Sequence, residues 1–551
     1  MPDDLESELR AAIARILSSE SRKKLIVAGP GTGKTTLFRK VLEQVSEGPD
    51  DALALTFINN LKDELDQKLS DRARVFTFHG YCHALLRRNG ILREGLTRDF
   101  KYFPGLASLI KGDWALTRGG KPPQFVELMR DLGDGEETAF YLERSNYYDA
   151  VEFDDSVFRV HGQLRAHPEE VDRYKMVLVD EYQDFNKMEA SFIDLLATPN
   201  PILIVGDDDQ ALYAQLRGSS HEFIRSLYHG GEYESFELPF CMRCPQVIVD
   251  AIADLVAQAR TLGKLDGRID KPYRFYEPVK CTDSARYPKI RVVGTSVQSN
   301  TANYMGQFIA EVISAIPADE VEASRTEDFP TALVIGPIHY LRQIESYLKK
   351  QGFTIMAKED GAQLKPQRQD GLGLLADNER SNLGWRVVLG ADEPRFLKSV
   401  IRRSVEERIP LIDLVPEDYR QSILDEVRGA ATSPPSDRGE KEAEKESEGA
   451  APTIRLTSFE GSKGLSAQHV YIVGLTEGDL PRNASDIKDL EICRLIVALT
   501  RTRKQCTLLY TRMFSGKPMR PSPFLGWIRP ERKWGIRVDS KFWEALKKSR
   551  E

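Results

Sequence analysis

The 551-residue sequence predicts an α/β protein built on two parallel sheets, each with helices on both faces. In the first half, helical stretches separate short apolar runs, which lie at 25–27, 53–56, 176–179 and 201–205. A second series follows at 290–293, 333–335, 354–356, 470–473 and 507–510. Apolar runs of this length, separated by helices, are typical of buried strands in parallel sheets. We therefore expect two α/β domains that meet near residue 245.

Two stretches interrupt the alternation and divide the chain further. Residues 90–170 are mostly helical in pattern and rich in aromatic side chains, so we expect a helical insertion in the first domain. A second insertion spans 361–428, and the following 429–452 is a charged linker with almost no large apolar side chains. The two domains are then discontinuous and comprise 1–89 with 171–245, and 246–360 with 453–551.

The overall composition limits the location and the partners of the protein. No apolar run approaches the ~20 residues that a membrane span needs, and the acidic start of the chain lacks a signal-peptide core. We therefore expect a cytoplasmic protein without membrane contact. Six cysteines are too few for a disulfide framework in a chain of this length. The net charge of −7 argues against a chain that is basic throughout, but it allows a local basic groove.

A glycine-rich loop between a strand and a helix is the strongest local signal. It follows the run at 25–27, and a helical stretch begins after it at 36. The loop reads Ala28-Gly29-Pro30-Gly31-Thr32-Gly33-Lys34-Thr35, with Thr36 next. Glycines in such a loop turn backbone N–H groups toward phosphate oxygens at a helix N-terminus. Lys34 is placed to reach the outer phosphates and Thr35 to bind Mg²⁺, so the loop predicts a nucleoside triphosphate site.

Two adjacent carboxylates, Asp180 and Glu181, follow the run at 176–179. At a strand end one carboxylate can hold Mg²⁺ through water, while the other orients or deprotonates an attacking water. Acidic strand ends are common, so this pair carries weight only beside the phosphate-binding loop. A second polar segment follows the run at 201–205 and reads Gly206-Asp207-Asp208-Asp209-Gln210.

With these segments in this order, the chain resembles the UvrD/Rep/PcrA group of superfamily 1 helicases. The resemblance covers nearly the whole chain and implies two RecA-like P-loop domains that clamp ATP and Mg²⁺ between them. It implies that Gln210 senses the γ-phosphate and that Gly464, within 458–465, lies in a motif linking nucleotide and DNA. Arg243 and Arg501 match arginine fingers, which stabilise the transferring phosphoryl group. The implied catalytic residues are Lys34, Glu181, Gln210, Arg243 and Arg501.

The same resemblance implies that single-stranded DNA runs across both domains. The residues that match DNA-contact positions are Phe57, Asn59, Phe78, His79, Tyr213, Arg217, Ser458 and Lys463. Stacking of a base on an aromatic ring such as Phe57 is worth ~1–3 kcal/mol and tolerates any sequence. A place in the hydrophobic core is the alternative for Phe57 and Phe78.

The chain departs from the family where the family recognises adenine and regulates unwinding. Residues 1–24 contain no Gln, and Thr36 and Met242 replace the basic and aromatic side chains that sandwich the base. We therefore expect a relaxed nucleobase preference or an adenine pocket built differently. Glu460 and Ser466 replace a His and an acidic residue, and Gln215-Leu216 stands where the family has a DNA-stacking Trp. The second insertion is too short for the family's helical domain, and 382–386 is a candidate remnant of it.

These patterns predict a DNA-dependent ATPase that translocates on single-stranded DNA, by resemblance 3′→5′, and unwinds duplexes at junctions with single strands. The alternative is a helicase-like motor or nucleic-acid-gated NTPase switch in a larger repair or defence complex. A protein partner such as a nuclease would then supply the output, as the reduced insertion and the linker suggest. Cys241 and Cys244 form a CxxC without a second ligand pair nearby, which predicts two packed cysteines rather than a zinc or redox site.

Overall fold

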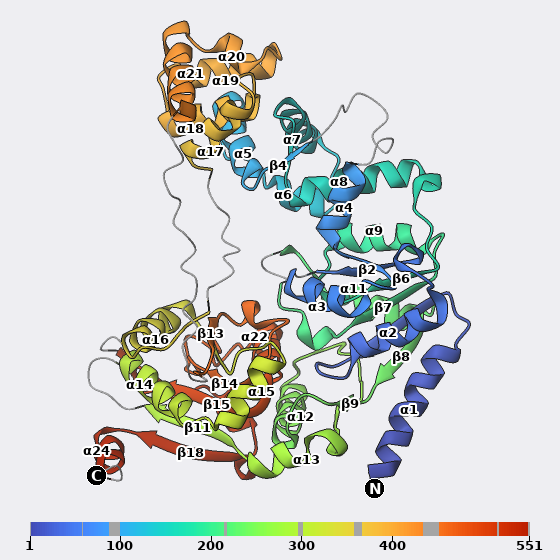
Figure 1. Cartoon of the computed structure of the whole chain (residues 1–551), viewed down its shortest axis with the longest axis vertical. Helices are drawn as coiled ribbons and strands as arrows, with labels where there is room; N and C mark the ends of the chain where they lie inside the picture. Colours follow the sequence, from blue (N-terminus) through green and yellow to red (C-terminus); the bar gives the residue numbers. More distant parts are fainter. Residues whose placement is uncertain are drawn as a thin grey trace.

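Two six-stranded parallel sheets, each enclosed by helices, form the centre of the molecule (Figure 1). The computed structural model describes residues 2–57, 59–87, 100–213, 217–295, 301–356, 366–432, 451–514 and 517–548. The strand orders are β3-β2-β6-β7-β1-β8 and β13-β12-β14-β15-β11-β18. This arrangement confirms the predicted fold class, an α/β protein with two RecA-like units.

The first sheet carries a helical layer on each face because successive side chains of its strands point to opposite sides. Its strands are β1 (Lys23–Ala28), β2 (Ala52–Thr56), β3 (Arg74–Thr77), β6 (Met176–Val179), β7 (Ile202–Gly206) and β8 (Glu234–Leu238). Ile26 and Ala28 pack toward α1 (Pro2–Ser18) and α2 (Lys34–Val45), beside α3 (Asn59–Leu69). Leu25 and Val27 pack toward the opposite layer, which consists of α4 (Phe78–Leu86), α8 (Phe153–Ala166), α9 (Lys187–Ala197) and α11 (His221–Gly230).

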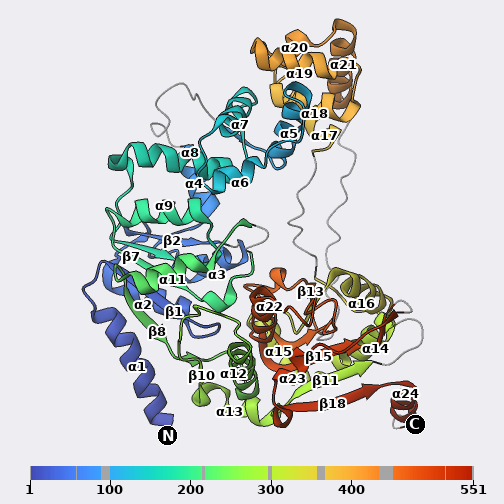
Figure 2. The same ribbon diagram turned by 180° about the vertical axis from the view of Figure 1, so that it is seen from behind.

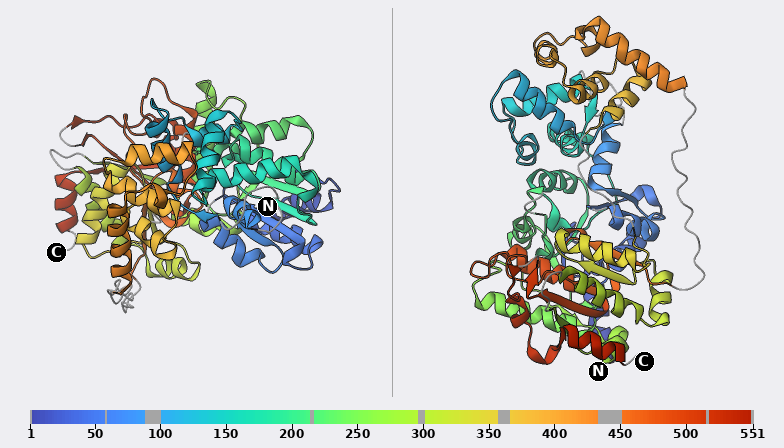
Figure 3. Two further views of the ribbon diagram at one scale, coloured as in Figure 1. Left: turned by 90° about the horizontal axis from the view of Figure 1, so that it is seen from above. Right: turned by 90° about the vertical axis from the view of Figure 1, so that its left-hand side faces the viewer.

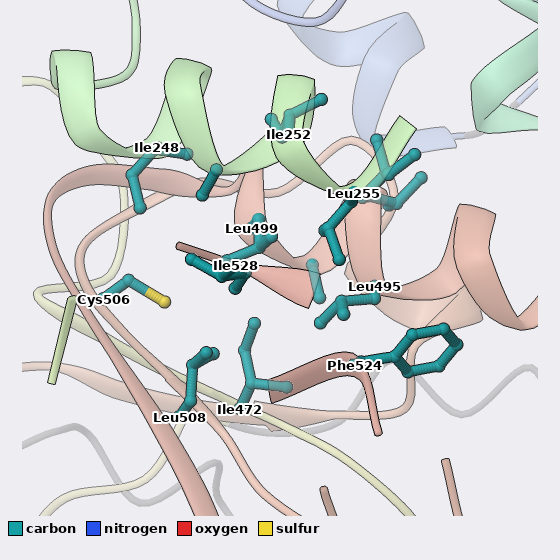
Figure 4. Close-up of a cluster of buried hydrophobic side chains, with 14 of the residues drawn as sticks. Ile248, Ile252, Leu255, Ile472, Leu495, Leu499, Cys506, Leu508, Phe524 and Ile528 are labelled. Atoms are coloured by element: carbon teal, nitrogen blue, oxygen red, sulfur yellow. The ribbon is translucent and has the colours of Figure 1, made fainter. Parts of the chain in front are cut away.

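The second sheet has the same construction. Its strands are β11 (Ile290–Thr295), β12 (Ala332–Ile335), β13 (Ile454–Thr457), β14 (Ala467–Ile472), β15 (Thr502–Thr511) and β18 (Lys533–Val538). One face packs against α14 (Thr301–Ser314), α16 (Ile338–Lys350) and α24 (Ser540–Lys548), near α15 (Ala318–Thr326). The other face packs against α12 (Gln246–Thr261), α22 (Asp489–Leu499) and α23 (Phe524–Trp527). Figure 4 shows Ile248 and Ile252 of α12 and Leu495 of α22 above Ile472 and Leu508 of the sheet.

Short elements connect the two halves of the molecule. Strands β9 (Phe240–Cys241) and β10 (Arg274–Phe275) pair beside α13 (Glu277–Arg286). Of the predicted strands, the run at 354–356 forms only an isolated bridge between Ile355 and Ile454, so that prediction was wrong. The remaining pairs are β4 (Lys101–Tyr102) with β5 (Ala150–Val151), and β16 (Met513–Phe514) with β17 (Lys517–Pro518). Among the described helices, none combines the length and the apolar character that crossing a bilayer requires.

The two helical insertions pack against each other. The first contributes α5 (Leu106–Thr117), α6 (Phe125–Arg130) and α7 (Glu136–Tyr147). The second contributes α17 (Arg368–Asp377), α18 (Asn382–Asp392), α19 (Leu397–Glu406), α20 (Leu411–Leu414) and α21 (Glu417–Thr432). We call these eight helices the helical cap, and Figures 2 and 3 show them together beyond the first sheet. The predicted linker 429–452 begins within α21, while its residues 433–450 lie outside the described residues.

One hydrophobic core spans the helical cap. Ile110 and Tyr141 of the first insertion and Trp385 and Ile401 of the second are all buried in the same cluster. A buried ion triad crosses the same contact: Asp113 binds Arg144 at 3.0 Å and Arg386 at 2.6 Å. Residues 382–386 are therefore part of an organised helical layer rather than an isolated remnant.

Candidate functional site

The glycine-rich loop surrounds the N-terminus of α2 at the carboxyl end of β1. Gly31 and Gly33 adopt left-handed backbone angles, with φ of +73° and +88°. Among the described residues no side chain caps α2, so the N–H groups of its first turn remain available to an anion. A Cβ atom on Gly31 would lie 2.5 Å from Cβ of Arg243, which shows how closely the two segments approach. The loop therefore fits the phosphates of a nucleotide.

A cavity of about 310 Å³ opens beside the loop, and both halves of the molecule line it. From the first half come Pro30, Gly31, Thr32, Gly33, Lys34, Thr35, Thr36, Asp180, Glu181 and Gln210. From the segment after β9 and from the second half come Met242, Arg243, Gly464 and Arg501. Ala28 is buried in β1, and Gly29 lies against the ring of Tyr273. Ala28 and Gly29 therefore support the base of the loop and do not line the cavity.

Glu181 begins the turn after β6 and has an unusual backbone conformation. Its φ of +54° lies in the left-handed region, which a residue with a side chain adopts at a cost of about 1–3 kcal/mol. Its carboxylate lies 3.3 Å from Lys34 Nζ and accepts a 2.5 Å hydrogen bond from Gln183. Burial alone would raise the pKa of Glu181, but Lys34 and Lys463 outweigh burial and hold that pKa well below its usual range. Glu181 is therefore an anion, as a proton acceptor must be.

Asp180 and Thr35 offer the oxygen atoms that suit Mg²⁺. Asp180 is buried directly after β6, and Thr35 is half-buried in the first turn of α2. Both residues line the same cavity as Lys34. The oxygen-only character of this pair fits a hard divalent cation that bridges protein and phosphates.

The two arginines predicted as fingers lie where the halves meet. Arg501 is 3% exposed, and its guanidinium donates to Oε1 of Gln210 at 3.1 Å. Burial and the nearby Arg243 lower the pKa of Arg501 to about 10, which still leaves it charged at neutral pH. Arg243 donates to the carbonyl of Thr500 at 3.5 Å. Arg243, next to the phosphate-binding loop, and Arg501, from the second half, both line the cavity.

Lys463 lies in a different environment from the predicted DNA surface. Its ammonium is buried, 2.5 Å from Asp184, 2.8 Å from the carbonyl oxygen of Gln210 and 3.3 Å from Glu181. In this structure Lys463 thus joins the two halves at the nucleotide site, and its contact with DNA stays a prediction. Burial raises the pKa of Asp184 to about 7 although Lys463 opposes that shift. Asp184 ends the acidic stretch 180–184, but sequence reasoning assigned it no role, because its contact with Lys463 joins segments 279 positions apart.

The aromatic residues expected to contact DNA form a closed cluster. Phe57 is 8% exposed, with the Tyr213 ring 5.9 Å away and the Arg217 guanidinium 4.0 Å above its ring. His79 is buried and lies 3.1 Å from Arg217. Phe78 is fully buried against Phe185 and Phe192, which agrees with the alternative of a place in the hydrophobic core.

The remaining predicted DNA contacts are placed more simply. Ser458 is exposed and accepts a hydrogen bond from the Gly461 backbone at 3.1 Å. Asn59 begins α3, but its side chain lies outside the described residues, as do Gln215 and Leu216. Ser458 is thus accessible to a ligand in this structure, unlike Phe57 and Phe78.

The region expected to hold the nucleobase lacks an aromatic stacking partner among the cavity-lining residues. Met242 lines the cavity, with its methyl group 3.6 Å from a Cβ built on Gly33, and Thr36 is exposed. Sequence reasoning missed Tyr273, which donates to the carbonyl of Pro30 at 3.0 Å. It also missed cavity-lining side chains from distant segments, namely Leu61, Lys68, Lys280 and Arg503. The CxxC cysteines are free, buried thiols in a hydrophobic cluster, as expected for packed cysteines.

Comparisons with known proteins agree with this geometry. Residues 10–215 match the family described as AAA domain (AAA_19). DNA helicase II of Haemophilus influenzae is 26% identical over 52% of this chain and 45% of that protein. ATP-dependent DNA helicase UvrD1 of Mycobacterium leprae is 26% identical over 48% of this chain and 41% of that protein. The chain thus spans less than half the length of these two relatives.

A third relative aligns over more of its length. DNA helicase II of Salmonella typhimurium is 24% identical across 96% of this chain and 88% of that protein. The segments that align include both sheets and both insertions. With its paired sheets and the order of its motifs, the chain resembles the UvrD/Rep/PcrA-type superfamily 1 DNA helicases.

Proposed function

We propose that the chain is a DNA-dependent ATPase that translocates 3′→5′ on single-stranded DNA and unwinds duplexes at junctions. The cavity between the halves carries this proposal, because the first sheet lines it with a phosphate-binding loop and two carboxylates. The second half lines it with Gly464 and Arg501. Because both halves line this site, hydrolysis requires them to lie close together. Binding and release of nucleotide can therefore drive movement of one half relative to the other. We also propose residue 245 as the boundary, since α12 packs on the second sheet directly after it.

The residues divide the work of hydrolysis between them. Lys34 and the backbone of the loop would hold the phosphates, and Thr35 and Asp180 would hold Mg²⁺, which neutralises phosphate charge. Glu181 accepts a proton from the attacking water or orients it. Arg501 and Arg243 stabilise the negative charge that develops on the transferred group.

The proposed DNA surface and the nucleotide site touch the same short segment of the second half. Tyr213 donates to the carbonyl of Glu460 at 3.1 Å, and Lys463 contacts Asp184 and Gln210. A movement of η5 (Glu460–Ser462) therefore acts on both sites. This supports coupling between hydrolysis and a step along the strand.

The proposal includes a relaxed nucleobase preference. Thr36 and Met242 stand at the positions that would sandwich a base, and neither offers an aromatic face or a fixed hydrogen-bond pattern. We expect kcat/KM values for ATP and GTP to agree within about tenfold, because unread base edges discriminate weakly. A preference for ATP of about a hundredfold would contradict this part of the proposal.

A second candidate function keeps the ATPase and removes independent unwinding. The closed cluster of Phe57, His79 and Arg217 favours a switch that hydrolyses only after nucleic acid opens it. In this form the chain would act inside a repair or defence complex whose partner, such as a nuclease, supplies the output. Strand displacement on a 3′-tailed duplex by the isolated protein separates the two candidates, since only the first predicts it.

The decisive experiment measures ATPase stimulation by single-stranded DNA, duplex DNA and RNA, beside unwinding of 3′- and 5′-tailed substrates. Single-stranded DNA should stimulate most, and only the 3′-tailed duplex should unwind. Lys34→Ala and Glu181→Gln should each abolish turnover, with Glu181→Gln still binding ATP. Exposed Lys101→Ala, in β4 beside the helical cap, serves as the control. Full turnover in either site variant would refute the assignment.

A further inference from the structure

Three consecutive carboxylates follow β7 and are almost completely buried. Asp207, Asp208 and Asp209 are 1%, 2% and 5% exposed, and their nearest oxygens lie within 4.8 Å of one another. Such spacing would suit a cation, and a side chain supplies that cation here. The ammonium of Lys271 lies 2.8, 2.7 and 2.9 Å from an oxygen of each carboxylate in turn.

Two arginines complete the cluster and balance its charge. Arg225 binds Asp208 at 3.1 Å, and Arg268 binds Asp209 through two hydrogen bonds of 2.7 Å. Three carboxylates therefore face three cations. Although burial lowers the pKa of Lys271, the surrounding carboxylates raise it further, so the ammonium stays charged. Replacing Lys271 with a neutral side chain would leave an excess negative charge in a buried site.

The cluster is joined to the nucleotide cavity through Gln210. The Nε2 group of Gln210 donates to Oδ2 of Asp207 at 2.9 Å, while Lys271 holds the other oxygen of that carboxylate. An ionised carboxylate only accepts hydrogen bonds, so the amide nitrogen of Gln210 must face Asp207. The carbonyl oxygen Oε1 then faces the cavity, where Arg501 donates to it at 3.1 Å.

The charge of Lys271 therefore decides which end of the amide reaches Arg501. Without a cation beside it, Asp207 would share a buried site with two other carboxylates, and such a site favours uptake of a proton. A protonated Asp207 can donate to Gln210, and the amide would then turn its nitrogen toward Arg501. Two donors would face each other there. Arg501 would keep its hydrogen bonds to the carbonyls of Val497 and Leu465 but lose the one that ties it to the first half.

We propose that Lys271, which lies outside the cavity-lining set, is a positioning residue that fixes Gln210 and thereby Arg501 for hydrolysis. The inference rests on the proposed ATPase function. Lys271 acts as a built-in cation in a three-carboxylate site and orients the amide without touching the nucleotide. Its removal slows the chemical step and leaves nucleotide binding intact, since the ion pairs of Lys271 go to Asp207, Asp208 and Asp209 and not to Lys34 or the phosphate-binding loop.

The test combines Lys271→Met with Gln210→Ala in the full chain. Lys271→Met should lower the kcat of DNA-stimulated ATP hydrolysis about 10²-fold, the scale expected for misplaced catalytic groups. Binding of a fluorescent ATP analogue should not change. If Lys271 acts through Gln210, the double variant is no slower than Gln210→Ala alone. Arg260→Met, which removes a cation from the exposed pair with Asp270, is the control and should keep full turnover.

A second variant covers the case in which Lys271→Met fails to fold. Asp207→Asn keeps the shape of the side chain, but Lys271 takes its carbonyl oxygen and leaves its NH₂ group facing Gln210. It should show the same loss of kcat, again without adding to Gln210→Ala. Independent, multiplicative losses, or unchanged kcat in Lys271→Met, would overturn the inference while the ATPase function stands. Absence of turnover in the unmodified protein with every nucleic acid would instead remove the proposed function and the inference together.

Discussion

The two sheets have the same strand order, but they face the cavity with opposite ends of their strands. Counted along the chain, both place their strands in the order third, second, fourth, fifth, first, sixth. The first sheet presents the carboxyl ends of β1, β6 and β7, where the loop, Glu181 and Gln210 follow. The second presents the amino ends of β14 and β15, which Gly464 and Arg501 precede. The same strand order thus gives the cavity an anion-binding loop from the first sheet and a positively charged side chain from the second.

The difference shows that strand order positions a site without deciding its chemistry. After β6 the first sheet has two carboxylates, whereas after the equivalent β14 the second sheet has Val473 and Gly474. The chemistry follows from residues at the strand ends. The second half therefore acts as a partner that brings positive charge to a reaction organised by the first.

Loss of the cation from the second half should have the largest effect. Arg501→Ala should lower the kcat of ATP hydrolysis about 10³–10⁵-fold, the contribution expected of an arginine finger. Nucleotide binding measured by fluorescence should persist. Arg537→Ala, at an exposed position of β18, is the matched control. A loss below about tenfold would show that the second half is not needed for the chemistry.

The next effect concerns the helical cap, where a buried ion triad joins an insertion of the first half to an insertion of the second. Asp113→Ala leaves Arg144 and Arg386 buried without their carboxylate, which should reduce the free energy of unfolding by about 3–5 kcal/mol. Urea denaturation measures the change. Asp377→Ala breaks an exposed ion pair with Lys101 across the same contact and should change stability little. Equal effects in both variants would mean that the buried triad does not hold the insertions together.

The aromatic cluster at the carboxyl end of β2 should bind DNA more weakly once one of its rings is removed. Phe57→Ala should weaken binding of single-stranded DNA by about 1–3 kcal/mol, the worth of one stacked base. Fluorescence anisotropy with an oligonucleotide gives the affinity. Phe236→Ala on β8, at the far edge of the same sheet, controls for a general loss of packing. Unchanged affinity for the Phe57 variant would place the DNA surface elsewhere.

The smallest effect concerns the imidazole of that cluster. Burial and Arg217 lower the pKa of His79 to about 3, whereas an unfolded His titrates near 6.5. Below pH 6.5 the unfolded chain therefore takes up a proton that the folded chain does not, and stability falls as the pH falls. Between pH 7.5 and 5 this amounts to about 2 kcal/mol. Urea titrations of His79→Gln should lack this part of the loss, and an unchanged pH dependence would contradict it.

Sequence patterns predicted the buried part of each sheet and missed the edges. The apolar runs gave β2, β6, β7, β14 and β15 because every residue of a central strand is enclosed by helices. Strands β8 and β18 went unpredicted since they lie at sheet edges and are largely exposed, so no continuous apolar run marks them. A continuous apolar run in the sequence indicates a buried strand, and edge strands are only partly buried.

The site divides in the same way. Motif spacing predicted Lys34 and Asp180 from local strand and loop structure, and the family resemblance added Arg501. All three line the cavity. The same resemblance predicts a DNA contact for Lys463. Its contact with Asp184 could not be predicted, because it joins residues 279 positions apart. The shared core of the helical cap likewise joins α5 and α18, and no local pattern links segments so distant.

The contact between Lys34 and Glu181 has a consequence for how tightly nucleotide binds. Their charges already compensate each other across 3.3 Å, and Asp180 and Asp207 help to keep Lys34 protonated. An arriving triphosphate therefore exchanges one anionic partner of Lys34 for another instead of filling an unpaired site. The affinity for a triphosphate would then report the difference between two ion pairs of Lys34 rather than the strength of one. The same exchange would free the carboxylate of Glu181 from Lys34 when a triphosphate is bound.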